Sequence, residues 1–309
     1  MMIGQYLLQF VQSSQINLWI VAPFIKNNAL YRLINGLNQQ VKIYCVTRWR
    51  PEEIATGVGD IDIWLLLKER GNSQLWIRND LHAKYYRADE TCLIGSANLT
   101  STALGWAPNP NLELLLDVPM SHPSLLNFES ELISKATRVD DALYLQIRDL
   151  AVQLKTEVNS LQRIEQEIEL MDISSIDREA WLPSLRNPEQ LYRAYQGEKD
   201  KFSSGVYEVA IADLRVLQIP RGLSKVSFES YVGYALLQIP MVQKIDAFVS
   251  QPRRFGEVSG YLKKLPFSTV MDFDSKYAWQ TLMRWLLYFY PQSYVSASLN
   301  YTEIFYRLK

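Results

Sequence analysis

Segments with the hydrophobic spacing of helices alternate with short apolar runs typical of strands along the first 140 residues. Apolar residues recur at helical spacing in residues 4–11, 28–37 and 60–70, and a further helix start at Ser121 and Pro123 predicts a helix to about residue 138. Shorter apolar runs predict strands at residues 17–23, 41–47, 74–77, 84–88, 92–95 and 112–118. Strands that alternate with helices are typical of a layered α/β domain with a mixed sheet.

The pattern changes after residue 139. Residues 140–171 predict one long helix, because Ile147, Leu154, Leu161 and Ile168 repeat every seven positions. Beyond a Ser- and Asp-rich stretch at 172–177, helical patterns dominate, at residues 188–195, 227–249, 252–265 and 275–290. Residues 206–217 fit a helix or a strand, and residues 301–308 fit a strand. We therefore expect a catalytic domain at 1–139, a helical linker at 140–177 and a mostly helical domain for target or partner binding at 178–309.

Composition fits an ordinary folded protein of 309 residues, with 48% hydrophobic and 21% charged residues. The apolar runs are too short to span a bilayer and the first residues lack a signal-peptide pattern, so we expect a cytoplasmic protein without membrane contact. Cys45 and Cys92 lie in apolar runs and are expected to be reduced core residues. Residues 186–309 carry 16 Lys and Arg against 11 Asp and Glu, which fits a polyanionic partner such as DNA.

Residues 82–98 bring together the side chains that suit phosphodiester chemistry. His82 and Lys84 are two positions apart, and so are Ser96 and Asn98, so each pair would share one face of a strand. An imidazole nucleophile, a fixed cation and two neutral hydrogen-bonding groups could then converge on one phosphate. The alternative is a structural role, because Gly, Ser and Asn in this order are also common residues of turns.

This spacing resembles the signature of the phospholipase D superfamily, His-x-Lys-x4-Asp followed by Gly-Ser-x-Asn. The matching residues are His82, Lys84, Asp89, Gly95, Ser96 and Asn98, and the resemblance covers about the first 140 residues. It implies a phospholipase D-like α/β/α fold for the first domain. Five residues separate Asp89 from Gly95, one fewer than is common in the family, which leaves the role of Asp89 open. Its place at a hairpin tip favours a turn former.

The resemblance implies a mechanism without metal or cofactor. In the family the histidine corresponding to His82 attacks phosphorus and forms a covalent phospho-histidine, while the positions of Lys84, Ser96 and Asn98 hold the phosphoryl oxygens. That mechanism uses two His-x-Lys sets, one histidine as nucleophile and the other as general acid. This chain has one set, because the other histidine, His122, has no such neighbour. We therefore predict a homodimer with a shared active site.

Glu113 is a candidate on separate grounds. It lies in the run Leu-Glu-Leu-Leu-Leu, which predicts a strand buried on both faces, and a buried carboxylate needs a partner. In the resembled family the corresponding residue orients the nucleophilic histidine. The alternative is a carboxylate at a sheet edge that points to solvent.

Two basic groups are candidates for substrate binding. Arg48, Trp49 and Arg50 follow the second strand, where arginine could hold a phosphodiester and tryptophan could stack on a base. Arg253 and Arg254, with Lys263 and Lys264, bracket a predicted helix and could contact DNA phosphates. A packed tryptophan and a solvated basic face explain the same residues structurally.

Three functions fit these patterns. The first is a metal-independent DNA endonuclease, which the resemblance associates with restriction or phage defence and with other defence-system proteins as partners. The second is a phospholipid hydrolase or transphosphatidylase, whose relatives usually carry two motifs in one chain. The third is a non-catalytic DNA-binding subunit of a larger defence complex.

Overall fold

The chain folds as two compact units, residues 1–158 and residues 159–309. This computed structural model describes every residue except 1–2, 156–178, 204, 266–272, 300–301 and 309. The predicted helix of residues 140–171 begins as helix α6, Asp141–Lys155, and its remainder lies outside the described residues. The predicted linker at 140–177 stays a prediction.

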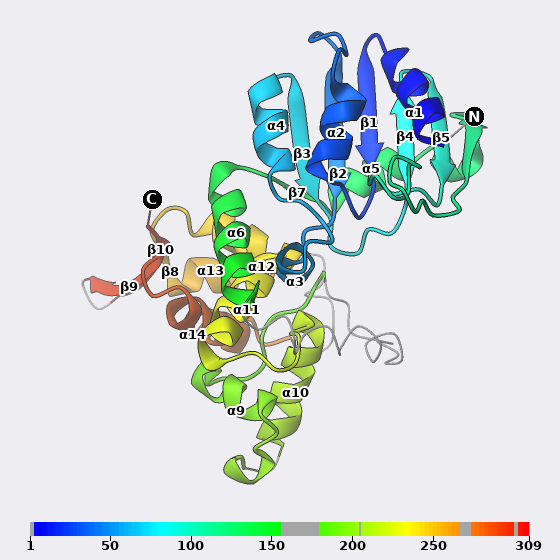
Figure 1. Ribbon diagram of the computed structural model, residues 1–309. Coiled ribbons are helices and arrows are strands. Elements are labelled where there is room, and N and C mark those ends of the chain that lie inside the picture. The colour runs from blue at the N-terminus through cyan, green and yellow to red at the C-terminus, as the bar shows by residue number, and fades with distance from the viewer. Residues whose placement is uncertain (1–2, 156–178, 204, 266–272, 300–301, 309) are drawn as a thin grey trace. The chain divides into compact units, whose positions relative to one another are not determined.

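A mixed seven-stranded sheet forms the centre of the first unit (Figure 1). Its strand order is β6-β5-β4-β1-β2-β3-β7. Strands β1, β2 and β3 are parallel, and the other neighbours pair antiparallel. The strands are β1 Asn17–Val21, β2 Lys42–Thr47, β3 Ser73–Ile77, β4 Tyr85–Ala88, β5 Thr91–Gly95, β6 Leu115–Pro119 and β7 Thr137–Arg138. The mixed α/β sheet predicted from the alternating pattern is confirmed.

Helices cover both faces of this sheet. Trp19 and Val21 of β1 form a buried cluster with Leu132 of helix α5, Phe128–Ser134. Leu18 and Ile20 alternate with them, so they face the opposite side, where helices α1, α2 and α4 lie (Figure 1). These helices are α1 Ile3–Gln12, α2 Asn27–Ile34 and α4 Ile63–Arg70. The layered α/β/α arrangement follows because apolar residues occupy both faces of β1.

The structure differs from the prediction in the two segments at residues 112–118 and 121–138. The run at residues 112–118 is not buried on both faces: β6 begins at Leu115, forms one edge of the sheet, and leaves Leu112, Leu114 and Leu116 exposed. A continuous apolar run identifies a strand but does not tell whether a neighbour covers it. The single helix predicted for 121–138 is instead a 3-10 turn, Pro123–Leu125, then α5 and β7.

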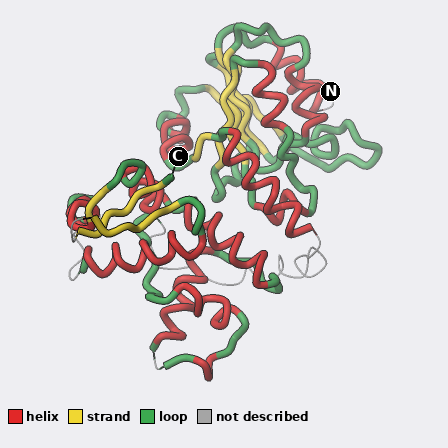
Figure 2. Tube along the Cα trace, turned by 90° about the vertical axis from the view of Figure 1, so that its left-hand side faces the viewer, coloured by secondary structure: helices red, strands yellow, loops and turns green. Residues whose placement is uncertain are grey.

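The second unit is mainly helical, as predicted, with an additional small sheet (Figure 2). Its sheet has the order β8-β10-β9, from Arg253–Arg254, Thr302–Arg307 and Tyr294–Leu299. Residues 206–217 form a helix, and Pro240 divides the predicted 227–249 helix in two, because proline cannot supply a backbone N–H within a helix. The helices are α9 Leu191–Tyr195, α10 Val206–Leu217, α11 Lys225–Leu237, α12 Pro240–Phe248, α13 Phe255–Leu262 and α14 Ser275–Phe289, with 3-10 turns η2 Pro188–Gln190 and η3 Lys199–Lys201.

Aromatic side chains form the core of this unit. Trp279 and Trp285 of α14 are fully buried, and Phe305 of β10 meets the Trp279 ring edge to face, 5.1 Å between centroids. Their spacing along α14 predicted this core role. In the first unit Cys45 and Cys92 are buried free thiols, as predicted. Over the described residues, the helices are too short or too polar to cross a membrane.

Candidate functional site

The strand pairing brings the candidate residues together at one end of the first unit's sheet, where some strands finish and their neighbours start. Val21, at the end of β1, pairs with Val46 near the end of β2 and with Tyr85 at the start of β4. Gly95, at the end of β5, pairs with Leu115 at the start of β6. The segments that leave β2 and β5 and those that enter β4 and β6 therefore lie at the same end of the sheet. These four segments carry the predicted site residues.

His82 and Lys84 lie in the irregular segment just before β4 and not within a strand. The His82 side chain is exposed, and no hydrogen bond to its imidazole is present within the described part of the chain. Lys84 Nζ donates to the backbone carbonyl of His82, 2.9 Å away. The cation is thus held beside the backbone of the candidate nucleophile, whose ring stays accessible.

Three charged groups share one electrostatic environment here. Burial lowers the pKa of Lys84, the carboxylate of Glu113 opposes this shift, and the positive charge of Arg48 adds to it. These influences come from three different segments of the chain. The carboxylate from the segment before β6 and the guanidinium from the segment after β2 therefore both act on the charge of Lys84.

Ser96 and Glu113 form a bonded pair across the entry to β6. Ser96 Oγ donates to Glu113 and accepts the backbone N–H of Leu114 at 3.0 Å. Asn111 Nδ2 donates to the other carboxylate oxygen at 3.2 Å. Glu113 is half-buried and lies just before the strand, so its predicted burial was wrong, although its carboxylate is partnered. Among the described residues its hydrogen bonds are to these neutral groups and not to His82.

Asn98 has its amide nitrogen available. Its Oδ1 accepts the backbone N–H of Phe24 at 3.4 Å, and the described residues offer no hydrogen bond to Nδ2. The buried hydroxyl of Tyr86 donates to the Ala97 carbonyl at 2.9 Å and holds the turn from behind. An amide anchored through its oxygen leaves its N–H groups free to donate to a substrate oxygen.

Arg48 is engaged by a residue that the sequence reading missed. Its Nε donates to Glu53 at 3.0 Å, its guanidinium lies over the Phe24 ring, and a terminal nitrogen is 3.5 Å from the Leu81 carbonyl. Glu53 belongs to helix α3, Pro51–Ala55, whose proline start and acidic first turn were a recognisable signal. Arg48 thus supports the segment that carries His82.

The neighbours of Arg48 have structural surroundings. Trp49 is 1% exposed, so the structure contradicts its predicted stacking on a base and supports the packed alternative. Arg50 donates to the Asn79 carbonyl at 3.0 Å.

Asp89 closes the β4–β5 hairpin, as its place at the tip predicted. It adopts a left-handed backbone conformation, with φ of 51°. Its carboxylate accepts the backbone N–H groups of Gln15, Ile16 and Asn17 at 2.7–2.9 Å. Burial acts to raise the pKa of Asp89, but these hydrogen bonds outweigh it and hold the pKa below its usual value. Asp89 therefore ties the hairpin to the start of β1.

No protein-family model matches this chain, and no curated protein matches it. Solved structures do. The chain is similar to Nuc from Salmonella typhimurium, a phospholipase D family member, at 18% identity, with 44% of this chain and 90% of that chain covered and a TM-score of 0.35. It is similar to NucT from Helicobacter pylori at 14% identity, with 44% and 89% covered and a TM-score of 0.34.

A third similar structure is phosphatidylserine synthase from Haemophilus influenzae Rd KW20. It is 12% identical, with 50% of this chain and 41% of that chain covered and a TM-score of 0.37. The likeness is one of fold.

The basic residues of the second unit differ in their surroundings. Arg253 Nε donates to the Phe248 carbonyl at 3.0 Å and its guanidinium lies 4.3 Å from the centroid of that ring, so packing accounts for it. Arg254 is exposed at the start of α13, where its backbone N–H donates to Glu257.

In the first unit His122 is exposed, as predicted, and its Nδ1 accepts the Ser124 N–H. The described residues contain no group of three or more His, Cys, Asp or Glu side chains arranged for a metal ion.

Gly95→Ala is expected to disturb the site through the backbone. An added Cβ would lie 1.9 Å from the Leu114 carbonyl oxygen, so β5 and β6 must separate where Ser96 and Glu113 meet. We expect a loss of about 1–3 kcal/mol in the free energy of unfolding, measured by chemical denaturation. Gly256→Ala is the matched control, because its Cβ meets nothing within 4 Å in helix α13. Equal stability of the two variants would contradict this account.

Proposed function

We propose that this chain is a metal-independent phosphodiesterase that acts as a DNA endonuclease through a covalent phospho-histidine. One observation carries the proposal: an exposed His82 and the Lys84 cation, both from the segment before β4, lie at the same end of the sheet as the free amide of Asn98, from the segment after β5. An accessible imidazole beside a cation and a neutral donor suits attack on a phosphodiester. DNA is the preferred substrate because of the net positive charge of residues 186–309.

The reaction has two steps. A ring nitrogen of His82 attacks phosphorus, the bond to the leaving oxygen breaks, and that oxygen takes a proton from a general acid. Water then attacks the phospho-histidine, loses a proton to the same group, and releases His82 with a phosphate monoester end on the product. Lys84 and Asn98 stabilise the charge on the non-bridging oxygens in both steps. Ser96 and Glu113 brace the loop that carries Asn98.

The general acid would be His82 of a second copy of the chain. The sequence contains one His-x-Lys set, so a single copy supplies half of the required groups. Leu116 of the edge strand β6 and Leu112 and Leu114 of the segment that enters it are exposed by 53%, 102% and 56%. Exposed apolar residues on an edge strand favour contact with another chain. We propose that this edge contributes to the dimer.

Restriction or phage defence, with other defence proteins, is the context that the resemblance favours.

Substrate class is tested by activity in EDTA. Wild-type protein is incubated with supercoiled plasmid and, separately, with phospholipid vesicles. Nicking or linearisation of the plasmid, with vesicles unchanged, is the expected result. Release of a headgroup from vesicles alone would overturn the nuclease proposal in favour of lipid chemistry. Inactivity on both substrates would favour the non-catalytic alternative.

Mixing variants tests the shared site. If each active site needs His82 from both copies, refolding equal amounts of wild type and His82→Ala together leaves about one quarter of the activity per total protein. Separate active sites would leave about one half. Leu114→Asp is expected to shift the protein to monomer in analytical ultracentrifugation and to abolish cleavage. A fully active monomer would sink the dimer proposal.

A further inference from the structure

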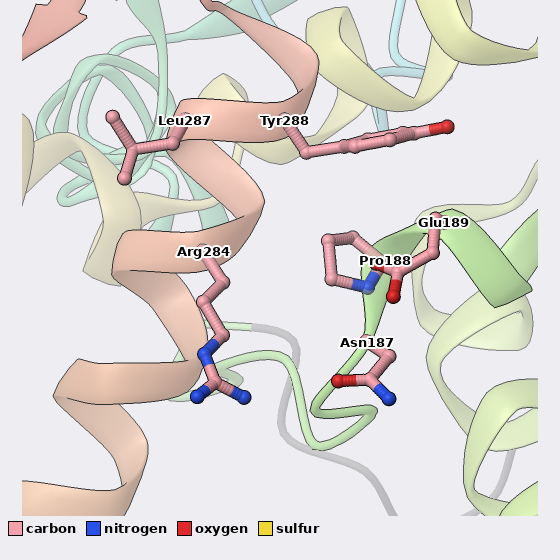
Figure 3. Close-up of a pocket in the computed structure, with 6 residues that line it drawn as sticks. All are labelled: Asn187, Pro188, Glu189, Arg284, Leu287 and Tyr288. Atoms are coloured by element: carbon pink, nitrogen blue, oxygen red, sulfur yellow. The ribbon is translucent and has the colours of Figure 1, made fainter.

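A hollow of about 480 Å³ lies in the second unit (Figure 3). It is lined by two segments, one on helix α14 and one at the start of η2, with Arg284, Leu287 and Tyr288 on the first and Asn187, Pro188 and Glu189 on the second. Positions 284, 287 and 288 share one face of a helix. The hollow is open to solvent, so it suits a ligand that keeps one side exposed. None of these lining residues is among the candidate site residues of the first unit.

Hydrogen bonds hold both walls of the hollow in place. Trp285 Nε1, on α14, donates to the Leu185 carbonyl at 2.7 Å. The buried carboxylate of Asp213 accepts the backbone N–H groups of Ser184 and Leu185 at 3.1 and 2.8 Å. The Tyr288 hydroxyl donates to Glu229 at 2.7 Å, which fixes its ring. The hollow is therefore formed before any ligand arrives, which lowers the entropic cost of binding.

Two polar side chains of the hollow have no partner in the described part of the protein. The half-buried guanidinium of Arg284 makes neither an ion pair nor a hydrogen bond there, and neither does the side-chain amide of Asn187. Figure 3 shows these two groups on opposite sides of the hollow, with Tyr288 extending above Pro188. A second guanidinium, that of Arg186, lies nearby. It donates to Gln280 Oε1 at 3.4 Å, and Gln280 is one helical turn before Arg284.

We propose that this hollow binds one nucleotide unit of an unpaired nucleic acid strand, with the base against Tyr288 and the phosphate on Arg284. A fixed aromatic ring beside an unpaired guanidinium, that of Arg284, is a combination that holds single strands, through stacking and phosphate contact. Glu189 can accept a hydrogen bond from the amino group of a base. The inference rests on the proposed function for its choice of nucleic acid.

The test uses the full chain carrying His82→Ala, so that no strand is cut. Fluorescence anisotropy measures its affinity for a labelled twelve-residue oligo(dC) strand. Arg284→Ala and Tyr288→Leu are each expected to weaken binding by roughly tenfold, with Arg284→Lys intermediate. Arg284→Ala should also lower the slope of log affinity against log salt by about one. Arg215→Ala removes the same charge from an exposed position on α10 and should change affinity by less than about twofold.

Competitors identify the ligand. Unlabelled oligo(dC) should compete better than oligo(dT), because thymine lacks the amino group that Glu189 would accept. Equal affinities for the Arg284→Ala, Tyr288→Leu and Arg215→Ala variants, with native circular dichroism, would overturn the proposal. So would stronger competition by polyglutamate than by oligo(dC). Because cleavage is absent from this assay, failure of the nuclease proposal in the plasmid assay leaves its result unchanged.

Discussion

His82→Ala is expected to lower plasmid cleavage by about four orders of magnitude or more, because it removes the atom that forms the bond to phosphorus. The exposed ring makes no hydrogen bond to the rest of the described chain, so its removal should leave the fold intact. Cleavage rates and the thermal unfolding midpoint measured together separate chemistry from stability. An unchanged midpoint with lost cleavage is the expected pair of results.

His122→Ala is the matched control for this variant. It is the only other histidine, is exposed, and caps a 3-10 turn through the Ser124 N–H. Its cleavage rate should stay within about twofold of wild type, because it lies outside the site, with a stability loss below about 1 kcal/mol. Rapid acid quenching of wild type with labelled substrate should also trap label on His82. If His82→Ala still cut plasmid at more than a tenth of the wild-type rate, the nucleophile would have to be reassigned.

Stability of the second unit is expected to fall as the pH rises through neutrality, because of Asp213. Burial raises the pKa of this carboxyl to about 7, and the N–H donors of Leu185 and Ser184 and the Trp181 side chain oppose that shift without cancelling it. In the unfolded chain the pKa returns to its ordinary value near 3.8. The folded form therefore binds a proton more tightly than the unfolded form between these two values.

The sign follows from linkage. The stabilising contribution of protonated Asp213 is complete below about pH 4 and is lost as the pH rises to about 7, a change on the order of 4 kcal/mol at most. Urea unfolding at pH 5, 6, 7 and 8 measures it. Asp213→Asn should flatten this dependence, whereas Asp200→Asn, at an exposed position, should preserve it. A wild-type stability that rises from pH 5 to pH 8 as the second unit unfolds would contradict the assignment.

Much of the first unit could be predicted because its sheet is built from uninterrupted apolar strands and clear turn residues. The hairpin with Asp89 at its tip is an example, since a short acidic turn between two strands admits few conformations. Helix α3 was missed because its five residues are too short to show a helical period. Glu113 shows the opposite error. Its apolar neighbours predicted burial, but β6 is an edge strand, and only strand order decides which strand lacks a neighbour.

The order of amino acids is enough to specify the chemical groups of this protein and their local spacing: one His-x-Lys pair, one Gly-Ser-x-Asn turn and a basic final third. Which of these groups meet depends on how the strands and helices pack. Arg48 binds Glu53 and not solvent, and Ser96 binds Glu113 across a strand pair. The Arg284 guanidinium lines a hollow in the second unit and has no partner among the described residues. Local patterns fix periodicity within one element, whereas contacts between elements depend on strand order and helix packing, which short-range spacing does not specify.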